Sequence, residues 1–441
     1  MHKIIAIAWF FIYFFLFPQN TEAQFLMDML DTTTEMGKGF LSMYKKFDHL
    51  RIGGYLQPQY QVASAEGAPN FSGGDFAKFS DNRFMIRRGR IRLDYVRLNT
   101  EGKSQLQFVF QVDATERGVF VRDLWGRYWE NKWQLFYFTT GMFARPFGYE
   151  VNLSSADRES PERGRMSQIL MRTERDLGVM ASFGVQKSKK FIRNIKIDAG
   201  FFNGQGLTGA TDFDSYKDFI GQVLIRPVNI APHLILSGGV SLFDGGLRQF
   251  STSAYRLQSK GGNIYRFEAD SLTTSQGDKL PRQYYGVNGQ LKWEHGWGNT
   301  ELRAEYWKGI QTATENTSET PGTSPILTGL TFAPNYIRNF NGAFLLFLQN
   351  IYSTKHQLGL KLDWYDPNTI VKGDQIGQAG SNLNAADIRF TTLGGGYLFY
   401  VDPNLKITFW YERVWNETTQ LQGFQSDISD NILTIRVQFR F

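Results

Sequence analysis

The residues whose types and spacing could support chemistry are three arginines in the segment 82–98, NRFMIRRGRIRLDYVRL. Arg88, Arg90 and Arg92 share one face of an extended chain with Asp94, because alternate residues of a β-strand point to the same side. Arginine keeps its proton at physiological pH, so the three guanidinium groups repel one another unless water, anions or acids surround them. The pattern predicts either a wet surface that favours anions and binds phosphate through paired hydrogen bonds, or a wall of salt bridges. The acids available for salt bridges are Asp94, Asp113 and Asp123.

Arg87 is an exception to this alternation, because its position places it on the face opposite Arg88. The sequence leaves three placements open for its side chain. It can lie at the level of lipid headgroups, in an interface between subunits, or at a β-bulge that turns it inward.

The kind of strand that must carry such a face is clearest at residues 432–441, ILTIRVQFRF. Odd-numbered residues from Leu433 to Phe441 are apolar, and even-numbered residues from Thr434 to Arg440 are polar. This alternation predicts a strand of a closed membrane barrel, with its apolar face toward lipid and its charged face toward a wet lumen. Closure matters because hydrocarbon cannot hydrogen-bond an open sheet edge. The alternative is an edge strand of a soluble β-sandwich. The final aromatic residue also resembles the terminal signature of bacterial outer-membrane proteins.

Alternating segments of this kind recur from residue 50 onward and number roughly sixteen, an even count as such barrels require. Short links alternate with long polar links, apart from one tight link near residues 116–118. This asymmetry is typical of short periplasmic turns and longer outer loops. The sequence therefore predicts an all-β fold, a transmembrane antiparallel β-barrel of about 16 strands. The long links are 63–81, 146–173, 244–282, 312–334 and 367–386.

The composition agrees with a barrel. Aromatic residues make up 15% of the 441 residues, while the mean hydropathy is only −0.34; alternating strands dilute hydropathy while they keep one lipid-facing side. Cysteine is absent, which excludes disulfides and thiolate metal sites. The net charge of +6 does not by itself imply nucleic-acid binding, and no basic tract with interleaved aromatic residues is present.

The chain divides into three predicted parts. Residues 1–23 resemble a secretory signal peptide, with a charged start, an apolar run too short to span a bilayer and a small-residue cleavage site. Residues 24–48 carry apolar side chains at helical spacing and predict a short amphipathic periplasmic helix that plugs the barrel, pairs with a copy of itself or binds a partner. A loosely ordered leader is the alternative. Residues 49–441 form the predicted barrel.

Several ordered motifs together resemble the phosphate-selective porin O and P family. Members are sixteen-stranded outer-membrane channels, usually trimeric, whose eyelet is lined by basic residues and narrowed by an inward-folded third loop. By position, that loop corresponds to residues 146–173 here. The resemblance therefore implies a bacterial outer-membrane location, a homotrimer and a passive channel. The motifs are RRGRIRL at 87–93, QVD at 111–113, VRDLWGRYWE at 121–130, TGMFARPFGYE at 140–150, ESPERGR at 159–165, RDLGVMASF at 175–183, LDWYDPN at 362–368 and YVDPNLKITFWYE at 400–412.

The predicted solutes are small polar molecules, with some preference for phosphate-like anions. The lumen looks mixed, however, because the predicted loop also holds acids and further acids face inward from the strands. The predicted pore-lining and anion-binding residues are Arg51, Arg88, Arg90, Arg92, Arg145, Arg158, Arg163, Arg165 and Arg172. The predicted inward strand acids are Asp113, Asp176, Asp198, Asp218, Glu301, Glu305 and Asp363.

Two other classes of function compete with a porin. An outer-membrane hydrolase would need a catalytic set, but the histidines are scattered and suggest none, so no enzyme, metal site or cofactor is predicted. A structural or partner-binding barrel remains open and would show no conductance. One strand, at 336–350, is apolar on both faces around residues 344–348, which predicts burial against either a neighbouring subunit or a loop that fills the lumen.

Overall fold

The computed structural model describes residues 49–184, 191–208, 212–270, 275–322 and 332–441. The predicted signal peptide and helical leader lie outside these residues. Among the residues described, no helix has the length and apolarity needed to cross a membrane.

Of the eighteen strands in the described residues, sixteen form the barrel and two, β10 (Ala254–Ser259) and β11 (Tyr265–Asp270), form a hairpin in which β10 pairs in parallel with residues 335–337 of the barrel wall. The barrel begins with β1 (Leu50–Ala63), β2 (Asn82–Leu98), β3 (Ser104–Thr115), β4 (Gly118–Trp129), β5 (Phe136–Ala144), β6 (Arg175–Phe183), β7 (Ile195–Phe202), β8 (Asp218–Ala231) and β9 (Leu234–Arg248). It continues with β12 (Lys279–His295), β13 (Gly298–Ala313), β14 (Asn335–Ile351), β15 (Ser353–Asp366), β16 (Phe390–Asp402), β17 (Leu405–Asn416) and β18 (Ile432–Arg440). The predicted number of strands is confirmed.

In the part of the chain that the structure describes, helical structure occurs only in the connections. The inward-facing connection between β5 and β6 contains α3 (Arg165–Leu170). Short 3₁₀ turns occur at η2 (Phe191–Asn194), η3 (Gly206–Thr208), η4 (Gly373–Gln375) and η5 (Ala385–Asp387).

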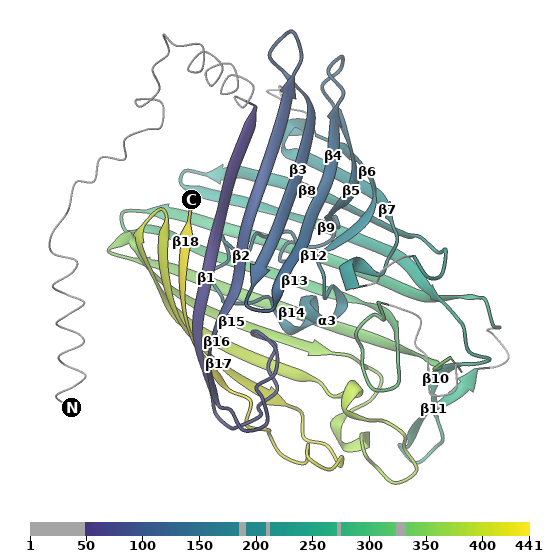
Figure 1. Cartoon of the computed structure of the whole chain (residues 1–441). Helices are drawn as coiled ribbons and strands as arrows, with labels where there is room; N and C mark the ends of the chain where they lie inside the picture. Colours follow the sequence, from purple (N-terminus) through teal and green to yellow (C-terminus); the bar gives the residue numbers. More distant parts are fainter. Residues whose placement is uncertain (1–48, 185–190, 209–211, 271–274, 323–331) are drawn as a thin grey trace, which may run out of the picture. The chain divides into compact units, whose positions relative to one another are not determined.

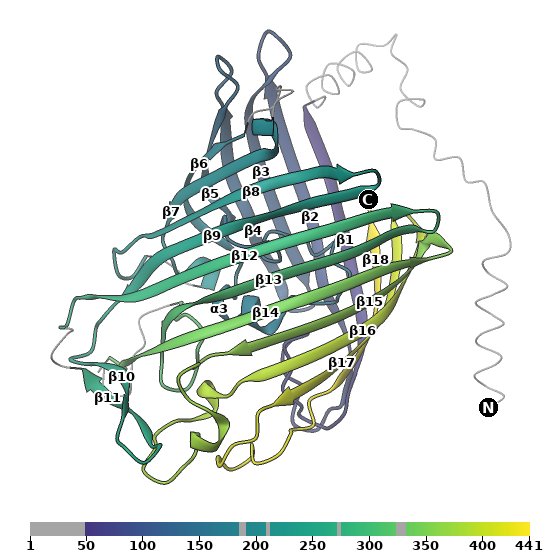
Figure 2. The same cartoon turned by 180° about the vertical axis from the view of Figure 1, so that it is seen from behind.

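The barrel is closed by antiparallel pairing of its first and last strands. The register of this seam runs from Tyr55 opposite Arg440 to Ala63 opposite Ile432. On the other side, β9 pairs directly with β12 and bypasses the β10–β11 hairpin. The wall can be followed from β1 to β9 in Figure 1 and from β12 to β17 in Figure 2. Every barrel strand therefore has two neighbours, and no sheet edge meets the lipid.

The distribution of side chains across the wall is the reverse of that in a soluble protein. In β18, Leu433 is 38% exposed and Phe439 is 48% exposed on the outer face, whereas Thr434 and Arg436 are buried inside. The same holds in β3, where Leu106 and Phe108 are exposed outward. An apolar exterior and a polar interior fit a barrel in a membrane, not the soluble sandwich that was the alternative.

The two ends of the barrel differ. At one end, which we call the turn end, strands are joined by links as short as Tyr352 or residues 403–404, and the first and last strands also have their termini there. At the opposite, loop end, most links are long. The sequence of residues 228–231 is typical of a tight turn and predicts a short link there, but this prediction is wrong: the segment lies within β8, which continues through two register irregularities.

The predicted loop 244–282 also contains more structure than expected. β9 continues to Arg248, and the β10–β11 hairpin follows it. The hairpin buries Phe267 against Tyr336, Val371 and Ile376, so its strands are stabilised by packing with other connections. This tertiary packing is not visible in the local sequence pattern.

The apolar core lies inside the barrel and fills part of it. Phe344, Leu346 and Leu348 of β14 pack with Trp410 of β17 and with Tyr149 from the connection between β5 and β6. On its outer face β14 exposes residues such as Leu345 and Phe347. Of the two explanations for this doubly apolar strand, the structure favours a lumen-filling loop.

Candidate functional site

The connection from residue 145 to 174, which we call the inward loop, folds into the barrel between β5 and β6, and its helix α3 lies inside the ring of strands (Figures 1 and 2). Its first turn is held by Glu305 of β13, which accepts hydrogen bonds from the backbone N–H groups of Tyr149 at 2.7 Å and Glu150 at 2.9 Å. Gly148 precedes them with a positive φ of 68°, and a side chain there would collide with Glu305. The third loop expected from the resemblance is therefore folded inward.

The centre of the inward loop is fixed by Glu162. This buried carboxylate lies 2.5 Å from Arg88, 2.9 Å from Arg87 and 2.9 Å from Arg436. Burial alone would raise the pKa of Glu162, but the arginines outweigh burial and hold that pKa well below its usual range. The loop is thereby tied to β2 and β18 at the seam of the barrel.

Other loop carboxylates bind cations on other strands. Glu159 lies 2.8 Å from Arg303 of β13, and Glu150 forms an ion pair with Lys361 of β15. Burial opposes ionisation of Glu150, yet Lys361 and then Arg158 keep its pKa below the usual value. Glu159 and Glu150 thus neutralise wall cations instead of facing open water.

The arginine ladder is paired along its whole length. Arg88 pairs with Glu162, Arg90 lies 2.9 Å from Asp113, and Arg92 lies 2.6 Å from Asp94. The structure therefore contains the salt bridges of the second interpretation. The acid that pairs with Arg88 is Glu162 of the inward loop, and it is not among the acids that the sequence suggested for these salt bridges. Asp123 instead pairs with Arg175, at 3.2 Å.

Arg87 points inward because the alternation of β2 changes phase beside it. Ile86 before this position and Ile91 after it both point outward. They are five residues apart, whereas in regular alternation two outward positions are an even number of residues apart. Both Arg87 and Arg88 reach Glu162. Of the three placements left open, an inward-turning bulge is the one observed.

A second bulge lies in β4. Its register with β3 shifts from Gln111 opposite Asp123 to Val112 opposite Val121, which leaves Arg122 without a paired residue. Arg122 turns inward and lies 2.5 Å from Glu174 at the end of the inward loop. Sequence reasoning missed both residues, because Arg122 precedes an inward-facing aspartate and strict alternation would place it outside.

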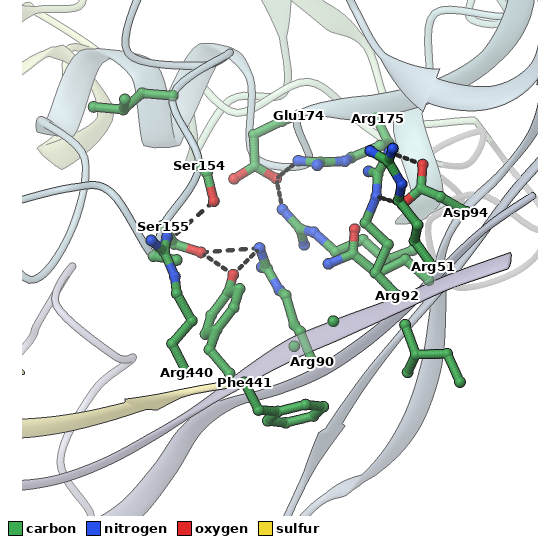
Figure 3. Close-up of a pocket in the computed structure, with 18 of the residues that line it drawn as sticks. Arg51, Arg90, Arg92, Asp94, Ser154, Ser155, Glu174, Arg175, Arg440 and Phe441 are labelled. Carbon is green, nitrogen blue, oxygen red and sulfur yellow. Dashed lines mark hydrogen bonds and ion pairs between the residues drawn. The ribbon is translucent and has the colours of Figure 1, made fainter. Parts of the chain in front are cut away.

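The polar space beside β1–β4 contains two cavities. The first, which we call the turn-side cavity, has a volume of ≈ 450 Å³ and reaches the start of β1 and the end of β18 (Figure 3). The second, the loop-side cavity, has a volume of ≈ 640 Å³ and reaches the connection between β1 and β2. Arg90, Arg122 and Glu174 line both cavities, so the cavities meet at these three side chains, which we call the constriction.

The constriction is held in place by neutral groups as well as charges. Arg90 donates a hydrogen bond to the hydroxyl group of Tyr55 at 2.7 Å. It donates another to the hydroxyl group of Ser155 at 2.9 Å, as Figure 3 shows. Glu174 is contacted by three arginines, and burial is outweighed by Arg122 and Arg163, so its pKa lies well below the usual range. Its carboxylate therefore stays ionised at neutral pH.

The two cavities differ in charge. The turn-side cavity has six arginines against two acids, namely Arg51, Arg90, Arg92, Arg122, Arg175 and Arg440 with Asp94 and Glu174. The loop-side cavity has six arginines against five acids, namely Arg87, Arg88, Arg90, Arg122, Arg163 and Arg172 with Asp75, Asp113, Glu162, Glu174 and Glu319. Positive charge is therefore concentrated on the turn side.

The structure brings six of the nine predicted site arginines to these cavities: Arg51, Arg88, Arg90, Arg92, Arg163 and Arg172. The other three lie elsewhere. Arg145 is buried and donates to the carbonyl of Thr173, Arg158 is buried within the loop, and Arg165 lines a different cavity. Sequence position alone could not tell a lumen-facing loop arginine from one that holds the loop together.

Comparisons with known proteins agree on the fold. The sequence matches no protein-family model and no curated protein. The structure is similar to the outer-membrane channel DcaP of Acinetobacter baumannii, with a TM-score of 0.53 and 12% identity over 89% of this chain and 97% of that one. It is also similar to OprB of Pseudomonas putida, with a TM-score of 0.55 and 9% identity over 93% of this chain and 98% of that one. At these identities the similarity shows a shared barrel fold, and membership in the phosphate-selective porin family stays a prediction.

Proposed function

We propose that the chain forms a water-filled channel in the bacterial outer membrane, through which small polar solutes diffuse passively, with a preference for anions. The closed barrel with an apolar exterior supports the location. Two polar cavities that meet at Arg90, Arg122 and Glu174 support the channel.

The charge of the turn-side cavity is the observation that carries the anion preference. Its lining has six arginines and two acids, and arginine remains charged at every physiological pH. A cleft lined mainly by one sign of charge raises the local concentration of ions of the opposite sign. The loop-side cavity is nearly balanced and adds little to the preference.

The preference is expected to be partial. Most arginines of the passage are paired with acids, so only part of their charge is available to a passing ion. Phosphate-like anions remain the favoured solutes within this proposal, because guanidinium groups bind phosphate oxygens in pairs and because the sequence resembles a phosphate-selective family. The same resemblance supports a homotrimer, which a mass measurement of the barrel in detergent tests.

Planar-bilayer recording of the purified barrel tests the proposal. In a gradient of potassium chloride, we expect a stable conductance and a reversal potential that indicates a preference for chloride. A cation-selective reversal potential would contradict the anion preference but not the channel. A folded, inserted barrel without conductance would favour the competing proposal, a structural or partner-binding barrel.

A further inference from the structure

A third cavity, which we call the aromatic chamber, lies at the loop end and differs in chemistry from the two cavities of the passage. Its volume is ≈ 250 Å³. Residues from five connections or strand ends converge on it, and the ones that matter most are Phe71, Arg165, Phe390, Phe424 and Asp430. Phe71 and Glu319 also line the loop-side cavity, so the chamber adjoins the entrance of the passage.

Arg165 is the cation of the chamber, and its guanidinium group is held between two aromatic rings. The guanidinium carbon lies 4.3 Å from the ring centre of Phe71 and 3.8 Å from that of Phe390. These contacts with the ring faces restrict the position of the guanidinium group, and they use none of its N–H groups. Its Nε is buried without a hydrogen-bond partner.

Asp430 is the acid opposite Arg165, and the two side chains are not hydrogen-bonded to each other. Their closest atoms, Arg165 Nη2 and Asp430 Oδ2, are 4.0 Å apart, which is too long for a hydrogen bond. Asp430 is buried, and its Oδ1 has no hydrogen-bond partner. Burial raises the pKa of Asp430 to about 6, so its carboxylate is ionised at about pH 8 and can accept hydrogen bonds.

A donor and an acceptor at this separation suit a hydroxyl group, which accepts a hydrogen bond from the guanidinium and donates one to the carboxylate. Water can do the same. The aromatic walls, however, also offer apolar contact to the carbon frame of a larger solute, and pockets of this composition are typical of small-molecule sites. Because Arg165 is matched by Asp430, and Glu319 by Arg172, a solute with a net charge would gain little from the chamber.

We propose that the aromatic chamber binds a small neutral solute that carries several hydroxyl groups on a carbon frame, such as a monosaccharide, before it enters the passage. The proposal is separate from the anion preference, which rests on the turn-side cavity. It assigns Arg165 to binding in the chamber and not to the lining of the constriction.

Titration calorimetry of the purified, folded barrel in detergent at about pH 8 tests the proposal, with D-glucose, D-galactose and D-mannose as probes and sodium acetate as a charged probe. We expect saturable binding of at least one sugar and no saturable binding of acetate. Asp430→Asn removes the ionised acceptor and should weaken binding about tenfold or more. The matched control is Asp374→Asn, an acid of a neighbouring connection that does not line the chamber, and its affinity should equal that of the unmodified chain.

A second variant guards against a folding defect in the first. Phe390→Leu keeps an apolar side chain but removes one of the two rings that hold Arg165, and it should also weaken sugar binding while the barrel stays folded. The absence of saturable binding for all three sugars would overturn the proposal, as would equal affinities for Asp430→Asn and Asp374→Asn. Because calorimetry needs no current, either result leaves the proposed channel to be judged by its conductance.

Discussion

Oε2 of Glu162, in the middle of the inward loop, lies 2.5 Å from Nη2 of Arg88 on β2. Both side chains are almost completely buried, and the two residues are 74 positions apart in the sequence. A buried ion pair of this kind does not guarantee stability, but removing one partner leaves an uncompensated charge. The position of the inward loop therefore depends on this carboxylate.

We expect Glu162→Gln to release the inward loop from the wall. The change leaves Arg87, Arg88 and Arg436 without their shared acid, and breaking a buried pair in this way typically costs about 3–5 kcal/mol. Limited proteolysis within the loop and noise in single-channel currents should both increase. The control is Asp157→Asn, whose ion pair with Arg440 is largely exposed and should be worth no more than about 1 kcal/mol. Equal protease resistance of the two variants would contradict this prediction.

The same contacts predict how the channel responds to acid. Because the folded-state pKa of Glu162 is depressed, its ion pairs contribute stability that is fully present above the ordinary carboxyl pKa of about 4.3 and is lost as pH falls through the lower folded value. Glu150 and Glu174 also have depressed pKa values and share this window. Currents should stay quiet from about pH 8 to 5 and become noisy only below about pH 4. A transition centred near pH 6 would show that a different group controls the loop.

The turn-side arginines should set the selectivity. In the double variant Arg51→Gln with Arg92→Gln, we expect the chloride preference to fall, because both side chains line the turn-side cavity. The change should shrink in about 1 M salt, where the screening length falls from roughly 8 Å at physiological salt to roughly 3 Å. Arg97→Gln, an exposed position on the same strand that lines neither cavity, is the matched control. An unchanged reversal potential in the double variant at low salt would remove the turn-side cavity as the source of selectivity.

Glu174→Gln should have the opposite effect. The carboxylate lies 2.5 Å from Arg122, 3.5 Å from Arg163 and 3.6 Å from Arg175, so its loss leaves three arginines at or beside the constriction without this partner. The chloride preference should therefore rise. Glu319→Gln serves as the control, since within the described part of the chain Glu319 forms its ion pair with the exposed Arg172, away from the constriction. A decrease in chloride preference would mean that the constriction had collapsed instead of gaining free positive charge.

Closure of the barrel should depend on Gly54. A Cβ at this position would collide with the Arg90 carbonyl and lie 2.6 Å from the Phe441 ring, so Gly54→Ala should reduce the yield of folded barrel. At neighbouring Gly53 the nearest atom to an added Cβ is the Phe441 carbonyl oxygen at 3.5 Å, an ordinary contact, and Gly53→Ala should fold normally. Heat-modifiable migration on gels measures the folded fraction, and equal yields from the two variants would refute this role of Gly54.

Alternation along the strands allowed most of the fold to be predicted. A wall between lipid and water requires strands with one apolar and one polar face, and β18 and β3 meet this requirement by alternating apolar and polar residues. The requirement is therefore visible in the local sequence. The predicted inward acids likewise lie inside, including the buried Asp218, Glu305 and Asp363. A bulge breaks this rule by one residue, and nothing in the local pattern marks where it occurs. This is why the inward direction of Arg87 stayed open and that of Arg122 was missed.

The charge of the passage was harder to predict, because it depends on which side chains meet across the lumen. Arg88 pairs with Glu162 and Arg303 pairs with Glu159, and both acids come from a loop whose path is set by many simultaneous contacts. Periodicity identifies the face on which a residue lies, but it does not identify a partner on another element. The ladder could therefore be recognised from the sequence, while its neutralisation could not.

The contacts of the inward loop also have a consequence for the order of folding. Glu162 needs Arg88 from the second strand and Arg436 from the last, and these two strands flank β1, which closes the barrel by pairing with β18. Contacts between such distant parts of a chain form late, because much of the chain must already be ordered before they can form. The loop can therefore dock fully only after the last strand has found the first. A barrel that has inserted without closing would lack the constriction, so the appearance of a narrow, quiet pore would report that assembly is complete.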